Sequence, residues 1–129
     1  TAWRLKADLP AERYNAASVA VDGKMWVIGG GEKLAGCHGI EWDLAWPPTA
    51  SVIIYDPETD NWTPGVPLPS ARSCCRAAVE HDGSIFLVGG RGPPFRFQNG
   101  RWSKLPAIPG NDLLHFPCVD LLRDSTFVN

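Results

Sequence analysis

Residues 52–72 read VIIYDPETDNWTPGVPLPSAR, and the spacing within this stretch occurs three times in the chain. In it, Trp62 is followed by five residues, then by a Leu-Pro pair and, three positions later, by an arginine. The same frame starts at Trp3 and, with an Ile-Pro pair, at Trp102, where Asp112 replaces the arginine. A unit that recurs with a period of roughly 40–50 residues is typical of propeller blades.

The amino-acid sequence that follows each of the first two frames also repeats. Two apolar segments are joined through Asp-Gly, and the second ends in Gly-Gly. Asp-Gly predicts a hairpin turn, and glycine permits positive φ or close backbone approach. First segments are rich in small residues and second segments in bulky ones, as expected for sheets that converge on a central axis. The predicted strands are 16–21, 25–28, 52–55 and 61–63, then 77–79, 85–88, 95–97 and the segment at Trp102, with 118–122 and 127–128 beginning a third unit.

These features resemble the kelch repeat. The resemblance rests on the double glycines of the second strands, the tyrosine of one third strand and the tryptophans of the fourth strands: Gly29-Gly30, Gly89-Gly90, Tyr55, Trp62 and Trp102. It implies an all-β fold made of four-stranded, antiparallel kelch-type β-propeller blades, here a partial propeller. It covers nearly the whole chain except residues 31–50, and it fades after Pro109. We expect the residues that carry it to be structural.

The resemblance also predicts how the chain is divided. Kelch propellers close with more blades than this chain supplies, and an open stack would expose a broad apolar face. We therefore expect either a larger parent chain or self-association. The expected units are an outer strand and loop of a preceding blade (1–12), a first blade (13–68) with an insertion (31–50), a second blade (69–108) and the start of a truncated third blade (109–129).

The composition and net charge limit the classes of partner that this chain is expected to bind. Hydrophobic residues make up 44% and charged residues 20% of the 129 residues, which is ordinary for a soluble globular protein. The net charge of −2 gives no electrostatic argument for nucleic acid or for an anionic membrane. The apolar runs are too short to span a bilayer. We expect a protein or peptide partner, with neither nucleic acid nor membrane.

The cysteines do not form the paired spacing of a zinc site. Cys74 and Cys75 are neighbours in a predicted strand, so their side chains should point to opposite faces. Small buried thiols are favoured over disulfides, which leans towards a reducing compartment such as the cytoplasm. The full set is Cys37, Cys74, Cys75 and Cys118.

Binding residues are expected on one rim of the blades. In kelch-like blades the connections from second to third strand and from fourth to first strand emerge on the face that such domains use for binding. Here these connections are 31–50 and 91–94, with 4–13, 64–73 and 104–115.

The longest of these connections offers two tryptophans. Trp42 and Trp46 fit aromatic anchors for a partner, or they fold back over the insertion's own core. The nearby Cys37-His38, with Glu41 and Asp43, has no spacing that defines a metal site. We expect neither a metal nor a cofactor.

Three arginines lie near the same rim: Arg13, Arg72 and Arg91. Guanidinium groups suit carboxylates and acidic peptides. The alternative is that they pair with backbone or acidic groups of a neighbouring blade. Both interpretations stay open at this point.

No catalytic pattern is visible: the sequence has no Gly-x-Ser-x-Gly elbow, phosphate loop or HExxH. We therefore expect a non-enzymatic protein-interaction module, part of a scaffold or substrate adaptor, that binds its partner through rim loops. The alternatives are a fragment of a kelch-type enzyme, such as a sugar mutarotase or oxidase, and a self-associating structural repeat whose open edges pair between chains.

Overall fold

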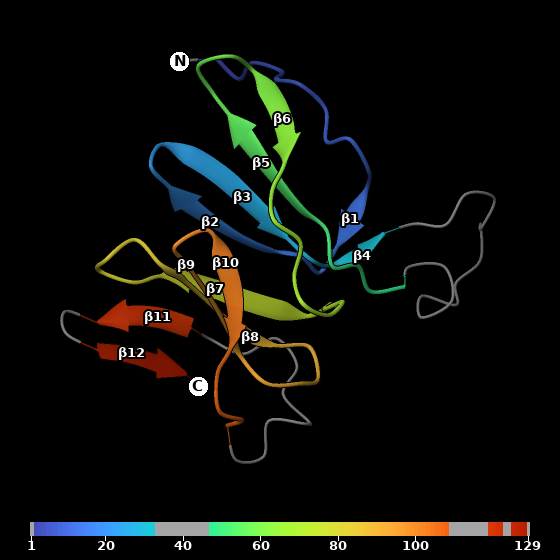
Figure 1. Cartoon of the computed structure of the whole chain (residues 1–129). Helices are drawn as coiled ribbons and strands as arrows, with labels where there is room; N and C mark the ends of the chain where they lie inside the picture. Colours follow the sequence, from blue (N-terminus) through green and yellow to red (C-terminus); the bar gives the residue numbers. More distant parts are fainter. Residues whose placement is uncertain (1, 33–46, 109–118, 123–124, 129) are drawn as a thin grey trace.

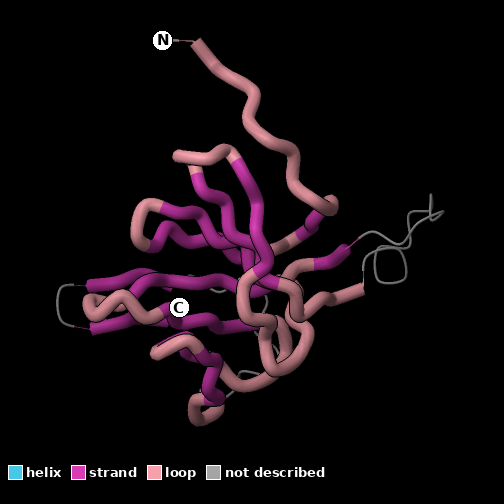
Figure 2. Tube along the Cα trace, turned by 45° about the horizontal axis from the view of Figure 1, so that its top comes forward, coloured by secondary structure: helices cyan, strands magenta, loops and turns pink. Residues whose placement is uncertain are grey.

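A computed structural model describes residues 2–32, 47–108, 119–122 and 125–128, which form strands, turns and loops (Figure 1, Figure 2). The first four-stranded sheet is antiparallel, with strand order β2-β3-β5-β6. Its strands are β2 (Ala17–Val21), β3 (Lys24–Ile28), β5 (Val52–Asp56) and β6 (Asn61–Pro64). We call this sheet blade 1.

The second sheet, blade 2, repeats this order as β7-β8-β9-β10. Its strands are β7 (Cys75–Val79), β8 (Ile85–Gly89), β9 (Phe95–Gln98) and β10 (Arg101–Lys104). The hairpin of β11 (Val119–Leu122) and β12 (Ser125–Val128) lies against β7 and starts the next sheet. The predicted all-β fold of partial propeller blades is confirmed, and β2, β7 and β11 follow one another at the inner edge (Figure 1).

A short sheet that the sequence analysis did not anticipate joins β1 (Arg13–Tyr14) to β4 (Gly31–Glu32). It lies where the chain enters and leaves the inner half of blade 1. The pairing brings Arg13 opposite Glu32, which are far apart in the sequence.

Turn chemistry fixes the hairpins. Asp22 and Gly23 have φ of 50° and 75°, and Asn99 and Gly100 have φ of 54° and 78°. Positive φ at both central residues is the type I′ geometry that matches the twist of the flanking strands. The β7–β8 hairpin is longer, because Val79 pairs with Ile85.

The main core lies between the two blades. Blade 1 contributes Ala17, Ile28 and Val52, and blade 2 contributes Leu87 and Phe95, all of them buried. Small residues occupy the inner strand and larger ones the strands behind it, which agrees with the taper predicted from the sequence.

The repeated tryptophans connect successive frames. Trp62 Nε1 donates a hydrogen bond to Ala7 O at 3.0 Å, and Trp102 Nε1 donates one to Val66 O at 2.9 Å. In both cases the acceptor is the fourth residue after the tryptophan of the preceding frame. Trp3, which stands first, is fully exposed (101%). The indole therefore acts as a staple between consecutive units, in line with the structural role predicted for these positions.

Aromatic pairs brace these staples from within each blade. The Tyr55 and Trp62 rings lie 5.1 Å apart, and Phe97 and Trp102 repeat this distance in blade 2. Tyr55 also donates a 2.6 Å hydrogen bond to Asp60 Oδ1, which raises the pKa of Tyr55 to about 12.

The expected opposite orientation of Cys74 and Cys75 within one strand is wrong. The strand begins at Cys75, and Cys74 precedes it with φ of 57°, the conformation that Asn15 adopts before β2 with φ of 56°. Cys74 N donates to Asn15 O at 3.1 Å, so the two positions link the blades. Cys75 is buried and Cys74 half-buried, both as free thiols, whereas Cys37 and Cys118 lie outside the described residues.

Candidate protein-binding face

The connections between strands gather on one side of the blades, which we call the rim face (residues 29–32, 47–51, 65–74, 89–94 and 105–108). Backbone hydrogen bonds hold them together: Gly30 N donates to Arg72 O (2.7 Å) and Arg72 N donates to Thr49 O (3.1 Å). Leu105 N donates to Pro94 O at 2.9 Å in blade 2. Segments far apart in the sequence therefore form one continuous surface.

Arg13 is anchored within blade 1. Its Nη1 donates to Gly29 O (2.9 Å) and Ser51 O (3.1 Å), and its Nη2 donates to Ser51 Oγ (2.7 Å). An ion pair of 3.0 Å joins Nη2 to Glu32 Oε1, and the Arg13 side chain is only 4% exposed. These contacts match the interpretation in which the arginine pairs inside the propeller.

Arg72 occupies the equivalent position in blade 2. Its Nη1 donates to Gly89 O at 3.1 Å, as Arg13 does to Gly29 O, and the guanidinium lies 4.3 Å from the centre of the Phe95 ring. The residue is 2% exposed, and this burial lowers the pKa of Arg72. The arginine that opens each blade thus caps the glycine that ends the second strand of that blade.

The other predicted binding residues differ in their placement. Arg91 is exposed on the rim face with φ of 61°. Trp42 and Trp46 lie outside the described residues, as do Cys37, His38, Glu41 and Asp43. Arg72 belongs to the β6–β7 connection and Arg91 to the β8–β9 connection, both next to blade 2, whereas Arg13 lies one blade away.

Sequence reasoning missed two rim positions that matter for charge. Glu32 supplies the carboxylate for Arg13, and Gly92 stands at the corresponding distance from the double glycine of blade 2. An alignment of Gly29-Gly30 with Gly89-Gly90 could have revealed this difference, because Glu32 and Gly92 then occupy the same position.

A cavity of about 520 Å³ lies at the start of the inner strands. Leu9, Arg13, Asn15, Ser18 and Arg76 are among its lining residues. Its volume falls in the range of sites for small molecules. Nothing in the sequence analysis singled out this group of residues.

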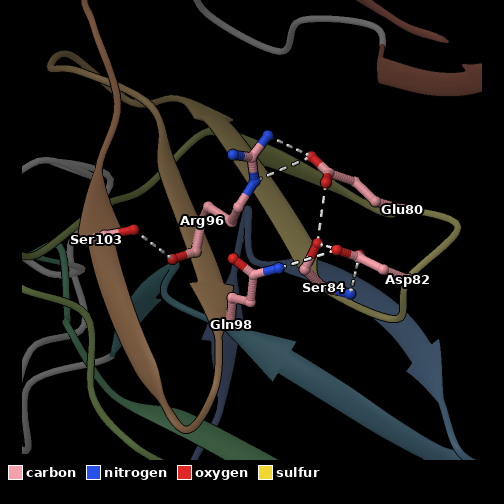
Figure 3. Close-up of polar contacts among 6 residues, drawn as sticks. All are labelled: Glu80, Asp82, Ser84, Arg96, Gln98 and Ser103. Carbon is pink, nitrogen blue, oxygen red and sulfur yellow. Dashed lines mark hydrogen bonds and ion pairs between the residues drawn. The ribbon is translucent and has the colours of Figure 1, made fainter.

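The opposite ends of the strands carry a polar network on blade 2 (Figure 3). Arg96 donates to Glu80 Oε1 through Nε (3.2 Å) and Nη2 (2.9 Å), and Gln98 Nε2 donates to Asp82 Oδ2 (2.9 Å). Ser84 Oγ bridges both carboxylates, and hydrogen bonds from Ser84 lower the pKa of Asp82. Because the acids and bases satisfy one another, the network stiffens the β7–β8 hairpin against β9.

The described part of the chain holds neither a cluster of metal ligands nor a helix that could span a membrane. No three His, Cys, Asp or Glu side chains come together there as metal ligands. Among the same residues there is no helix with the length and hydrophobicity that a membrane span requires.

The kelch motif, as a sequence family, matches residues 12–69. The chain belongs to the kelch-repeat family. A kelch-like protein of Aspergillus terreus, terF, is 29% identical over 123 residues, covering 83% of this chain and 25% of that protein. An F-box/kelch-repeat protein of Arabidopsis thaliana is 34% identical, covering 69% of this chain and 20% of the relative.

Two further comparisons agree with this membership. Beta-scruin of Limulus polyphemus is 33% identical to this kelch chain over 82% of its length, which is 11% of the relative. The chain therefore spans a quarter or less of these relatives. The solved structure of YjhT matches with a TM-score of 0.81 and 17% identity, over 98% of this chain and 46% of that one, which shows the shared fold.

Proposed function

We propose that this kelch chain is a protein-interaction module, part of a scaffold or substrate adaptor, whose rim face binds a segment of a partner protein. The observation that carries the proposal is that backbone hydrogen bonds join the connections of blade 1 to the β6–β7 connection, whose Arg72 side chain donates to Gly89 O of blade 2. Function concentrates on loops that a rigid scaffold positions. The relatives support the proposal, since their names join kelch repeats to F-box or BTB domains.

Rigid presentation is the proposed mechanism. The tryptophan staples and the two capping arginines hold the connections in place before a partner arrives. A preorganised surface loses less conformational entropy on binding than a flexible one. Val66 and Arg91 are exposed on this face and are the described side chains that we propose as contacts, with Trp42 and Trp46 of the insertion added to them.

The proposal is tested by photo-crosslinking. A photoreactive amino acid is placed at Val66 or Arg91 on the rim face, or at Thr59 or His81 on the hairpins at the opposite ends of the strands, all exposed positions. We expect discrete crosslinks to a partner protein from the rim positions alone. An excess of the chain without the photoreactive residue should suppress these crosslinks by competition. Equal crosslinking from both faces, or none from the rim, would contradict the proposal.

The cavity at the inner strands favours a second candidate, a small-molecule or enzymatic site. Its size and its lining by Asn15, Ser18 and Arg76 suit a small polar compound. Ligand-observed NMR with a library of polar metabolites tests it. A binder lost on Ser18→Trp, with the rim crosslinks unchanged, would support this candidate separately from the first.

A further inference from the structure

The connection that follows β6 is rich in proline and contains the spacing Pro-x-x-Pro. Its sequence from Pro64 to Ser70 reads PGVPLPS, with prolines at 64, 67 and 69. A proline ring fixes its own φ at about −65° and restricts the preceding residue to extended conformations. Apart from Gly65, every residue from 63 to 69 is a proline or precedes one. The sequence therefore favours a polyproline II helix, which needs no internal hydrogen bonds.

The burial of this segment has the period of such a helix. Residues 65–68 form neither strand nor turn, and no residue from 64 to 69 has positive φ. Gly65 is half-buried, and Leu68, three residues later, is only 5% exposed. A polyproline II helix has three residues per turn, so residues three apart share one edge. The residues between them are all exposed: Pro64, Val66, Pro67, Pro69 and Ser70.

Main-chain hydrogen bonds fix the buried edge to the blades. Gly65 N donates to Val52 O and Leu68 N donates to Ala50 O, both at 2.8 Å. Trp102 Nε1 donates to the Val66 carbonyl at 2.9 Å, and this contact leaves the Val66 side chain 44% exposed. The segment is thus held in shape from both blades while its other two edges face outward.

We infer that residues 64–69 form a polyproline II ligand on the rim face, which docks into an aromatic-lined groove of the partner protein. This inference rests on the proposed function and names the class of partner. One outward edge consists of Pro64 and Pro67, and the other of Val66 and Pro69. Proline-rich segments with Pro-x-x-Pro spacing bind grooves of this kind because the helix is formed before binding.

The propeller favours this mode of recognition. A segment that is already held by three hydrogen bonds loses less conformational entropy on docking than a free peptide. The edge formed by Pro64 and Pro67 occurs in one of the three tryptophan frames only. The first frame has Leu5 and Asp8 at these positions, and the third has Lys104 and Ala107. The ligand is therefore particular to the connection after blade 1.

The inference is tested by NMR on the ¹⁵N-labelled full chain. The probes are purified SH3 and WW domains, two classes with aromatic-lined grooves for this helix. Each is compared with a variant that has alanine in place of a groove tryptophan. We expect at least one intact domain to cause saturable shifts of the Val66, Leu68 and Ser70 amides and of the Trp102 Nε1–H. Because residues 64–70 carry no charge, the Kd should change less than about 2-fold between low and physiological salt.

Two proline variants provide a matched comparison. Pro67→Ala should weaken binding about 10-fold, because it removes one ring that packs in the groove. Val66→Lys should abolish binding, since it places a charge on the other outward edge. Pro57→Ala is the control and should leave binding unchanged, because Pro57 is equally exposed but lies in the β5–β6 turn at the opposite ends of the strands. Urea unfolding midpoints establish that each variant is folded.

Three outcomes would overturn the inference: no saturable shift with either class of domain, equal shifts with an intact domain and its groove variant, or equal effects of Pro67→Ala and Pro57→Ala. If the rim crosslinks persist in that case, the proposed function stands alone. If a groove domain binds while the rim crosslinks fail, residues 64–69 remain a polyproline II ligand and the wider rim face loses its proposed role.

Discussion

Replacing Trp102 by phenylalanine tests whether the indole staple holds the two blades together. Trp102 is 9% exposed, and its Nε1 donates the 2.9 Å hydrogen bond to Val66 O. Phenylalanine keeps an aromatic ring beside Phe97 but removes the donor. The lost hydrogen bond costs about 0.5–1.5 kcal/mol. The reduced ring volume in a buried site adds about 1 kcal/mol, so Trp102→Phe should destabilise the fold by about 2 kcal/mol.

Urea unfolding followed by circular dichroism measures this loss. With a slope of about 2 kcal/mol/M, typical of small proteins, the midpoint should fall by about 1 M. Trp3→Phe is the matched control, because Trp3 has the same place in its frame but is fully exposed. Its effect should stay within about 0.5 kcal/mol. Equal losses for the two variants would refute the staple argument.

Three further outcomes follow from particular contacts. Gly92→Ala should cost about 1–3 kcal/mol in urea unfolding, because its φ of 146° strains any side chain and its Cβ would press against the Arg72 guanidinium; an unchanged midpoint would contradict this. Burial raises the pKa of Cys75 to about 11, above the usual 9.0, so the free energy of unfolding should fall as pH rises from 9 to 11; Cys75→Ala should remove this fall between pH 9 and 10, below the range in which the raised pKa of Tyr55 contributes. Glu80→Gln should cost at most about 1 kcal/mol and leave rim crosslinking unchanged, since its ion pair with Arg96 is partly exposed; a loss of crosslinking would link the two faces.

Local sequence chemistry predicted the strands well, because each signal depends on residues close in the chain. Asp22-Gly23 and Asn99-Gly100 adopt the positive φ angles that their turns require. The strands expected at 118–122 and 127–128 are present as β11 and β12, which pair in a hairpin. These features follow from backbone preferences and from the alternation of apolar residues, which need no knowledge of distant contacts.

The features that the sequence did not predict depend on contacts between segments far apart in the chain. Cys74 looked like part of a strand because its side chain is small and apolar. It instead has a left-handed conformation, and its backbone N–H donates a hydrogen bond to Asn15 O of the preceding unit. The pairing of β1 with β4 likewise joins segments separated by two strands, β2 and β3. Neither contact leaves a local pattern that the sequence could reveal.

The roles of the arginines illustrate the same limit at the rim face. The sequence placed Arg13 and Arg72 near the rim but left open whether they bind a partner or the propeller itself. Both side chains turn inward to a glycine carbonyl of their own blade, 16 and 17 residues further along the chain. Only the geometry could reveal that one of them has a carboxylate, from Glu32, and that the described residues supply none to the other.

The division between constant and variable positions explains how such a repeat can acquire specificity. The staples fall on the fourth strands and on the connections that follow them, so changes there loosen the contact between blades. The connections from second to third strand carry no staple among their described residues. Where blade 1 has Gly31 and Glu32, blade 2 has Arg91 and Gly92, so the charge of the rim differs between the blades. The double glycines and the capping arginines are the same in both. Specificity can thus change at these connections without loss of the fold, and there we expect further contacts with the partner protein.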